Sequence, residues 1–191
     1  MILGRRVAAA GCAAAILASA ACSSPPVKNL GIAGAAVRSF DLVARVAMRN
    51  GADAFTAKMY WQHGDASDRL EISSPFGQQV AMIYRDHSGA ELTAADGAKL
   101  RAASVEELTE RHFGIRVPMR LLPGWVLGRP GADAVVDHGE SGRINGFTED
   151  GWSVDYLEYS EVDTRLPTRI QARREPLSIR LAVDEWTINP R

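Results

Sequence analysis

Few side chains in this sequence are placed where they could support catalysis or bind a metal. No two histidines have the spacing of metal ligands, so we expect surface positions for all four, His63, His87, His112 and His138. Asp184 and Glu185 are adjacent carboxylates, but neighbours on a strand point to opposite faces, which favours a capping or solvated role. The sequence has no nucleophile elbow, phosphate-binding loop or dinucleotide fingerprint. We therefore expect no enzyme, no metal and no other cofactor.

Cys22 follows an N-terminus with the layout of a secretory signal. Arg5 and Arg6 precede an apolar stretch over 7–18, and small residues lead up to Cys22. A signal that ends at a cysteine is typical of bacterial lipoproteins, in which the thiol takes a diacylglycerol and the new amine can take a further acyl chain. The match is incomplete, because Ser19 stands where a leucine is usual.

The expected product is a lipid-anchored chain that starts at Cys22, after removal of a signal peptide over residues 1–21. The alternatives are cleavage without lipidation and a retained membrane span, although the apolar stretch falls short of the roughly 20 residues that a span needs. Without Arg5 and Arg6, 20 basic and 23 acidic side chains remain, and no basic patch favours nucleic acid. Cys12 and Cys22 are the two cysteines of the sequence, so we expect no disulfide in the mature domain.

The mature chain divides into a short tether and one domain. The tether covers 22–36 and includes a predicted short helix over 29–36, and the domain covers 37–191. Apolar and polar residues alternate through most of the domain, as in antiparallel strands with one buried face. This rhythm is typical of an up-and-down barrel or a curled sheet. About eleven strands are predicted, at 40–48, 55–62, 70–72, 79–85, on both sides of Asp96-Gly97, and at 134–138, 143–149, 152–159, 166–172 and 177–183.

The alternation is interrupted after the sixth predicted strand, where two helices are expected. Ser104 and Glu107 have the spacing of a capping box, and this helix should run to Phe113 and end at Gly114. The second helix, over 118–127, is imperfect but strongly apolar. The sequence therefore predicts a mainly β domain with a helical insertion.

Two apolar features of the domain have more than one interpretation. The apolar face of the sheet either fills an ordinary core or lines a cavity on the concave side of a curled sheet. Phe76 lies between Pro75 and Gly77 in a predicted turn, where side chains usually meet water. An aromatic residue there packs back on the domain, binds a partner or enters a membrane.

Several motifs together resemble the outer-membrane lipoprotein receptor family called LolB, and they occur in the order found in that family. They lie at 55–62, 74–78, 125–131, 150–152 and 184–186, so the resemblance covers about residues 40–186. The Pro-Leu-Gly turn of the family is Pro-Phe-Gly here, which keeps a large apolar side chain at the tip.

The resemblance implies an incomplete, open antiparallel β-barrel in which helices cover an apolar cavity for lipoprotein acyl chains. Such receptors accept lipoproteins from a periplasmic carrier of the LolA type and insert them into the outer membrane without ATP. The turn of Pro75, Phe76 and Gly77 is then the membrane insertion loop. Ser23 after Cys22 is similar to the sorting signal of outer-membrane lipoproteins. The implied protein is a lipid-anchored monomer that faces the periplasm and contacts outer-membrane lipids.

On this interpretation the inner face of the strands lines the cavity, and part of the second helix covers it. The expected lining residues are Phe55, Met59, Trp61, Leu70, Ile72, Ile83, Trp152, Val154, Tyr156, Ile170, Leu181 and Val183, with Leu121, Leu122 and Trp125 in the lid. The inward parity of 79–84 stays open, because Val80 and Met82 suit the inner face as well as Ala81 and Ile83. The alternative function is a lipocalin-like binder of small apolar ligands, and a periplasmic hydrolase is a third.

Overall fold

The computed structural model describes residues 37–163 and 165–188. Within these ranges eleven β-strands form a single sheet, and two α-helices lie between the sixth and seventh strands. The strands are β1 (Phe40–Asn50), β2 (Asp53–His63), β3 (Asp68–Ser73), β4 (Gln79–Asp86), β5 (Gly89–Ala94), β6 (Lys99–Ala102), β7 (Val135–His138), β8 (Ile144–Glu149), β9 (Trp152–Tyr159), β10 (Pro167–Arg174) and β11 (Leu177–Ile188). The expected signal peptide, Cys22 and the tether lie outside the described residues.

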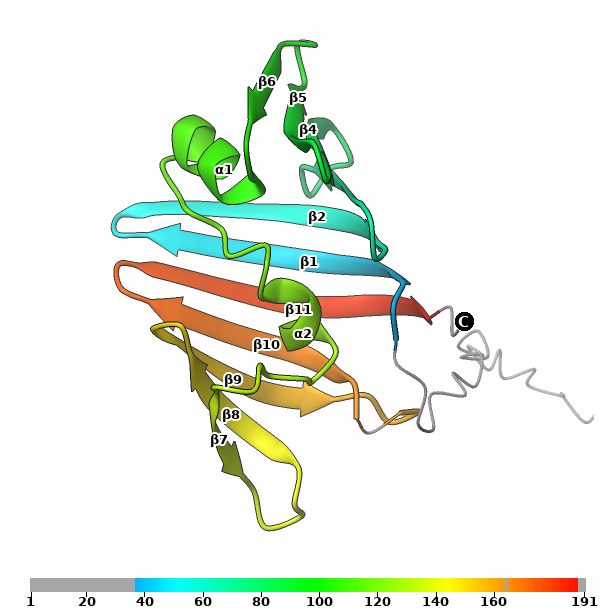
Figure 1. Ribbon diagram of the computed structural model, residues 1–191, viewed down its shortest axis with the longest axis vertical. Coiled ribbons are helices and arrows are strands. Elements are labelled where there is room, and N and C mark those ends of the chain that lie inside the picture. The colour runs from blue at the N-terminus through cyan, green and yellow to red at the C-terminus, as the bar shows by residue number, and fades with distance from the viewer. Residues whose placement is uncertain (1–36, 164, 189–191) are drawn as a thin grey trace, which may run out of the picture.

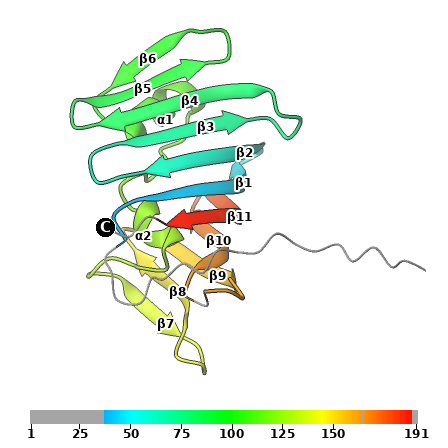
Figure 2. The ribbon, with the colours of Figure 1, turned by 90° about the vertical axis from the view of Figure 1, so that its right-hand side faces the viewer.

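The sheet forms an open barrel, and the first and last strands of the chain are neighbours at its centre. The order is β6-β5-β4-β3-β2-β1-β11-β10-β9-β8-β7, with antiparallel pairing throughout (Figure 2). The pair β1–β11 joins the two halves, whereas β6 and β7 are the free edges. The helical segment between these edges crosses the concave side, and α2 lies over β10 and β11 (Figure 1). The predicted incomplete antiparallel barrel is confirmed.

Strand register resolves the open question of parity in β4. Leu70 pairs with Ile83 and Ile72 pairs with Ala81, so cross-strand partners place Ala81 and Ile83 on the inner face. Both are buried, whereas Val80 is only partly buried. A register shift between Ile72 and Ser73 makes Val80 the extra residue of a bulge. Sequence alternation within β4 does not contain this information, because it depends on the partner strand.

The two helices form where the sequence offers start and stop signals. In α1 (Val105–Phe113), the Ser104 hydroxyl accepts a hydrogen bond from Glu107 N, and Gly114 ends the helix with a φ of 66°. The capping-box prediction is confirmed, although the Glu107 carboxylate accepts from Ala103 N, one residue earlier than in the usual box. The predicted second helix was too long, since α2 covers only Leu122–Val126. Pro123 lies in its first turn, which is where a helix tolerates proline.

The two ends of the sheet differ in how they are filled. We call the end with the β1–β2, β3–β4 and β10–β11 turns the open end, and the opposite end, where β1 begins, the closed end. At the closed end Phe40 and Leu42 are fully buried. The Phe40 ring lies edge-on to Trp61 at 5.0 Å between centroids and to Trp186 at 5.3 Å. The aromatic core therefore plugs this end.

Candidate binding cavity

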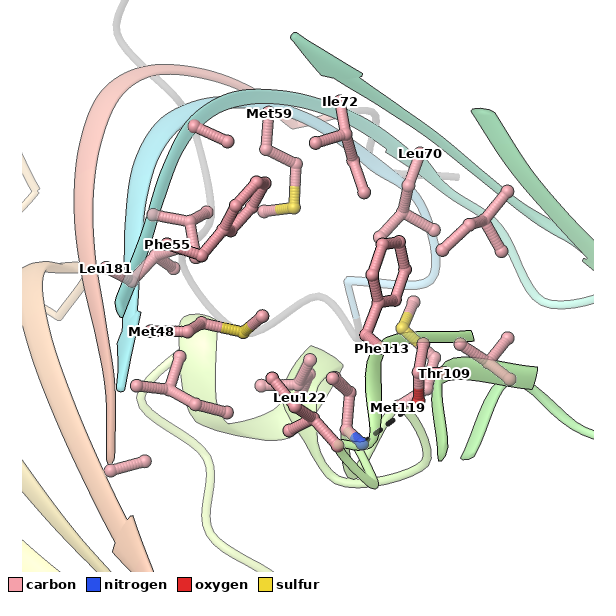
Figure 3. A pocket seen from close by; sticks show the side chains of 18 of the residues that line it. Met48, Phe55, Met59, Leu70, Ile72, Thr109, Phe113, Met119, Leu122 and Leu181 are labelled. Carbon is pink, nitrogen blue, oxygen red and sulfur yellow. Dashed lines mark hydrogen bonds between the residues drawn. The ribbon is translucent and has the colours of Figure 1, made fainter. Parts of the chain in front are cut away.

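The open half of the curled sheet encloses an apolar cavity of about 310 Å³. Its walls come from the inner faces of β1 to β4, β10 and β11, and its cover comes from α1, α2 and the segment between them (Figure 3). Figure 3 shows Met48, Phe55, Met59 and Leu122 pointing into the same empty space. A cavity with such a lining suits an apolar ligand better than water, because water gains few hydrogen bonds inside it.

Most of the residues assigned to the cavity from sequence do line it. They are Phe55, Met59, Trp61, Leu70, Ile72, Ile83, Leu122, Trp125, Ile170 and Leu181. The assignment was wrong for Leu121, Trp152, Val154, Tyr156 and Val183, which do not line it. Eight of the ten lining residues lie on β2 to β4 and on the covering segment, whereas three of the five others lie on β9.

The residues of β9 are covered by α2 rather than exposed to the cavity. Trp152 packs edge-on against Trp125 with ring centroids 5.6 Å apart. The Tyr156 hydroxyl donates a 2.7 Å hydrogen bond to the Trp125 carbonyl oxygen, and burial raises the pKa of this phenol. The Trp125 indole in turn donates to Glu149 on β8 at 2.7 Å. The inner face of β9 therefore belongs to the core. The hydrogen bonds of Trp125 to Tyr156 and Glu149 hold the cover in place.

Leu121 and Val183 fail to line the cavity for different reasons. Leu121 is buried and lines a separate, more polar cleft together with Trp152. Val183 is only partly buried and pairs with Ala44, one rung beyond Val46 and Leu181, where the lining ends on β1 and β11. Its inward orientation was predicted, but the position of the cavity along the strand was not.

Sequence reasoning missed the contribution of α1 and of the segment that comes after it. Val105, Thr109 and Phe113 lie at helical spacing and line the cavity from α1, and Ile115, Val117 and Met119 line it from the connecting segment. The sequence signal was present in both cases, as an i, i+4 stripe and as a period-two alternation. Val46 and Met48 on β1 and Ile179 on β11 were missed as well.

The polar side chains at the cavity wall are few, namely Asn50, Asp53 and Thr109. Thr109 donates a hydrogen bond to Glu106 O at 3.2 Å. It accepts one from Val117 N, also at 3.2 Å (Figure 3). The Asn50 side chain, in the last residue of β1, donates to Gly114 O at 3.4 Å. Asp53, across the hairpin from Asn50, is exposed. The other residues that line the cavity have apolar side chains.

A buried carboxylate lies just beyond the deep end of the cavity. Asp68 Oδ1 accepts hydrogen bonds from Trp61 Nε1 at 2.8 Å and from His63 Nδ1 at 2.6 Å, and Oδ2 accepts from Arg85. Burial alone would raise the pKa of Asp68, but the hydrogen bonds from His63, Trp61 and Arg85 outweigh it and hold this pKa below its usual value. The carboxylate is therefore ionised at neutral pH and binds all three donors.

The other chemistry-bearing residues are at the surface, with one exception. His87, His112 and His138 are exposed as expected, but His63 was wrongly expected there, since its side chain is only 14% exposed beside Asp68. In the described ranges no group of three or more His, Cys, Asp or Glu side chains could hold a metal ion.

Asp184 and Glu185 do not point to opposite faces as expected. A register shift in the β1–β11 pair makes Asp184 a bulge residue, and Glu185 lies opposite Val43. Both carboxylates are exposed on the outer face, where Asp184 pairs with Arg45 at 2.9 Å. Their predicted solvated role fits this position.

Phe76 is the most exposed large apolar side chain of the described residues, at 94%. The backbone of its turn is fixed by hydrogen bonds from Gly77 N to Ser74 O and from Ser74 N to Gln78 O, and Gly77 has a φ of 88°. The turn lies at the open end and reaches beyond its neighbours (Figure 2). No charged residue occurs between Glu71 and Arg85. Of the three interpretations of Phe76, packing back on the domain is therefore wrong.

An open antiparallel barrel around an apolar cavity, with a helical cover, is an architecture suited to binding apolar ligands. The sequence profile described as "Outer membrane lipoprotein LolB" matches residues 38–186. A protein of Azoarcus sp. named outer-membrane lipoprotein LolB is 34% identical to this chain, and the match covers 96% of each of the two chains. A protein of the same name from Thiobacillus denitrificans is also 34% identical, and that match covers 80% of this chain and 82% of the relative. The chain therefore belongs to the LolB family, a family of lipoprotein receptors and not of enzymes.

Among solved structures, a LolA superfamily protein from Nitrosomonas europaea is 10% identical and aligns over 81% of this chain and 88% of its own, with a TM-score of 0.49. In the part of the chain that the structure describes, no helix is both long and apolar enough to cross a membrane.

Proposed function

We propose that this protein is a receptor anchored to the outer membrane, which accepts lipoproteins from a periplasmic carrier of the LolA type and inserts them into that membrane. The observation that carries the proposal is the apolar cavity at the open end, with the exposed Phe76 at the same end. Membership of the LolB family and the names of the relatives support the same function and location.

The cavity supplies what the acyl chains of a lipoprotein need outside a membrane. Burial of an acyl chain is worth about 0.8 kcal/mol per CH₂, so a chain of about 16 carbons carries on the order of 12 kcal/mol. Such chains do not dissociate into water at a useful rate, and they need a route from one apolar site to the next. Transfer without ATP is expected if each site holds the chains somewhat more tightly than the previous one. Neither a nucleophile nor a metal takes part in such a step.

Phe76 is assigned the role of contacting the membrane at delivery. Its ring stands in water on a turn with a fixed backbone, and 13 uncharged residues separate Glu71 from Arg85 around it. A side chain of this kind gains about 1.5–3 kcal/mol when it leaves water for hydrocarbon. Because the cavity lies toward the same end of the sheet, insertion of Phe76 brings the cavity mouth to the bilayer surface.

The expected anchor on Cys22 is compatible with this orientation, although β1 begins at the closed end. Val37 lies fifteen residues after Cys22, and a chain of this length spans at most about 50 Å. β1 has 11 residues, which corresponds to a length of about 37 Å. The tether can therefore run the length of the domain, so that Cys22 and Phe76 enter the same membrane.

Phe76→Glu tests delivery separately from binding. We expect the variant to accept a lipoprotein from the carrier as the unchanged protein does, but to release little of it into vesicles, because a carboxylate at the tip resists entry into hydrocarbon. Unchanged acceptance together with unchanged release would favour a lipocalin-like binder whose exposed turn has no part in delivery. Loss of acceptance would contradict the separation of roles between cavity and turn.

A further inference from the structure

On β2, β3 and β4 the lining of the cavity ends at the same rung. Trp61, Leu70 and Ile83 are cross-strand partners on β2, β3 and β4, and all three line the cavity. Leu42, the partner of Trp61 on β1, is fully buried in the closed half. Phe40, at the closed end, packs in a T-shaped arrangement against the Trp61 ring. Trp61 is thus the largest side chain at the boundary between empty cavity and filled core.

The next rung toward the closed end is ionic. His63, Asp68 and Arg85 are cross-strand partners on the same three strands, so they come directly after the apolar rung on the inner face. The Asp68 side chain has no exposed surface, and the two other side chains of the rung bond to its carboxylate. Asp68 also accepts the indole N–H of Trp61 at 2.8 Å, which joins the ionic rung to the apolar one.

We propose that Trp61 is the floor that limits how far an acyl chain enters, and that Asp68 is the positioning residue that fixes its indole ring. This proposal rests on the function proposed above and adds that the cavity selects chains by length. With its N–H bound to Asp68 and its ring packed against Phe40, the indole cannot turn aside. A chain end that passed it would have to displace core aromatic rings or lie against a buried ion pair.

A floor predicts a distinctive dependence of affinity on chain length. Affinity should rise about fourfold with each added methylene while the added group is buried in the cavity. Once the chain end reaches Trp61, further methylenes remain at the mouth in water, and the affinity should level off. A cavity that was open at its deep end would show no such limit within the range of natural acyl chains.

The test measures binding of saturated fatty acids of increasing length, by displacement of a fluorescent fatty acid from the protein with Cys22→Ser, so that no lipid of its own competes. We expect Trp61→Leu to move the limiting length upward by at least one methylene. If Trp61→Leu does not fold, Trp61→Phe replaces it in the test, because it keeps an aromatic ring against Phe40. The matched control is Phe55→Leu near the mouth, which should change affinity at all lengths and leave the limiting length in place.

The role of Asp68 is tested through the same limiting length, which a purely structural residue would not move. Asp68→Ala removes the acceptor of the indole N–H, and we expect a longer or less sharply defined limit. Arg85→Gln is the matched control, because it weakens the same ionic rung but keeps the bond between Trp61 and Asp68. It should lower the melting temperature without changing the limiting length. In a Trp61→Phe background, where no N–H remains, Asp68→Ala should have no further effect on the limit.

The outcomes separate this proposal from the proposed function. If fatty acids bind but the limiting length is the same in the unchanged protein, Trp61→Leu and Trp61→Phe, then Trp61 is ordinary wall and the floor is refuted. An equal effect of Asp68→Ala and Arg85→Gln on the limit refutes the positioning role. If no acyl chain of any length binds the unchanged protein, the failure lies with the proposed function itself.

Discussion

Replacement of Phe76 by alanine should weaken membrane binding strongly and leave the fold unaffected. The ring is 94% exposed, so its removal takes no packing from the core, and the hydrogen bonds of the turn involve only the backbone and the Ser74 side chain. The loss of one inserted aromatic side chain corresponds to about 2 kcal/mol of transfer free energy, or roughly a 30-fold weaker partition into vesicles. Thermal unfolding should be unchanged, because exposed side chains contribute little to stability.

The assay is sedimentation with lipid vesicles, with Cys22→Ser in all proteins so that the expected anchor does not dominate binding. Val135→Ala is the matched control, because Val135 is also apolar and 75% exposed but lies on the edge strand β7. We expect the control to bind vesicles as the unchanged protein does, and Phe76→Leu to retain most of the binding. Equal losses in Phe76→Ala and Val135→Ala would refute the reasoning, since binding would then depend on total exposed apolar area rather than on the turn.

Two further predictions concern the cavity and the buried carboxylate. Met48→Asp should weaken acyl-chain binding at least about tenfold, because an entering chain would strip water from the carboxylate. Ala47→Asp, on the outer face of the same strand, should leave the binding unchanged. Equal effects of the two variants in a fatty-acid displacement assay would contradict the assigned lining of the cavity. The folded-state pKa of Asp68 is lowered, so its contribution to stability is complete above the unfolded-state pKa of about 3.9 and is lost as the pH falls through the lower folded-state value. The difference in unfolding free energy between the unchanged protein and Asp68→Asn, measured in urea, should therefore shrink as the pH is lowered below about 4, and a constant difference would refute the assignment.

The apolar alternation along the strands predicted the fold and the inner face, because a side-chain period of two is a consequence of strand geometry alone. It did not predict the surroundings of Trp152 or Val183, although both were correctly placed on the inner face. Whether an inner-face residue lines a cavity or joins the core depends on what packs over it. That is decided by α2 and by the aromatic plug at the closed end, far away in sequence.

Bulges set the other limit on prediction from sequence. One residue of β4, Val80, and one of β11, Asp184, are extra in their ladders, and each shifts the parity of the residues beyond it on its strand. A bulge is a property of two paired strands, so a single strand's alternation does not reveal it. Asp68 was overlooked for a related reason, since its three donors come from two partner strands.

The exposed turn, in contrast, could be singled out from sequence. An aromatic residue between Pro75 and Gly77 contradicts the usual chemistry of turns, and conflicts of this kind tend to mark functional positions. The turn's extension beyond its neighbours, and its place at the same end as the cavity, are properties of the sheet that only the structure supplies.

The central claim is that the cavity accepts acyl chains from a carrier, and a transfer assay tests it most directly. A labelled triacylated lipoprotein bound to a purified LolA-type carrier is mixed with the Cys22→Ser protein, and the label is tracked by size-exclusion chromatography. We expect the lipoprotein to move to this protein without ATP, and to remain on the carrier when Met48→Asp is used instead. Retention by the carrier in the presence of the unchanged cavity would contradict the account.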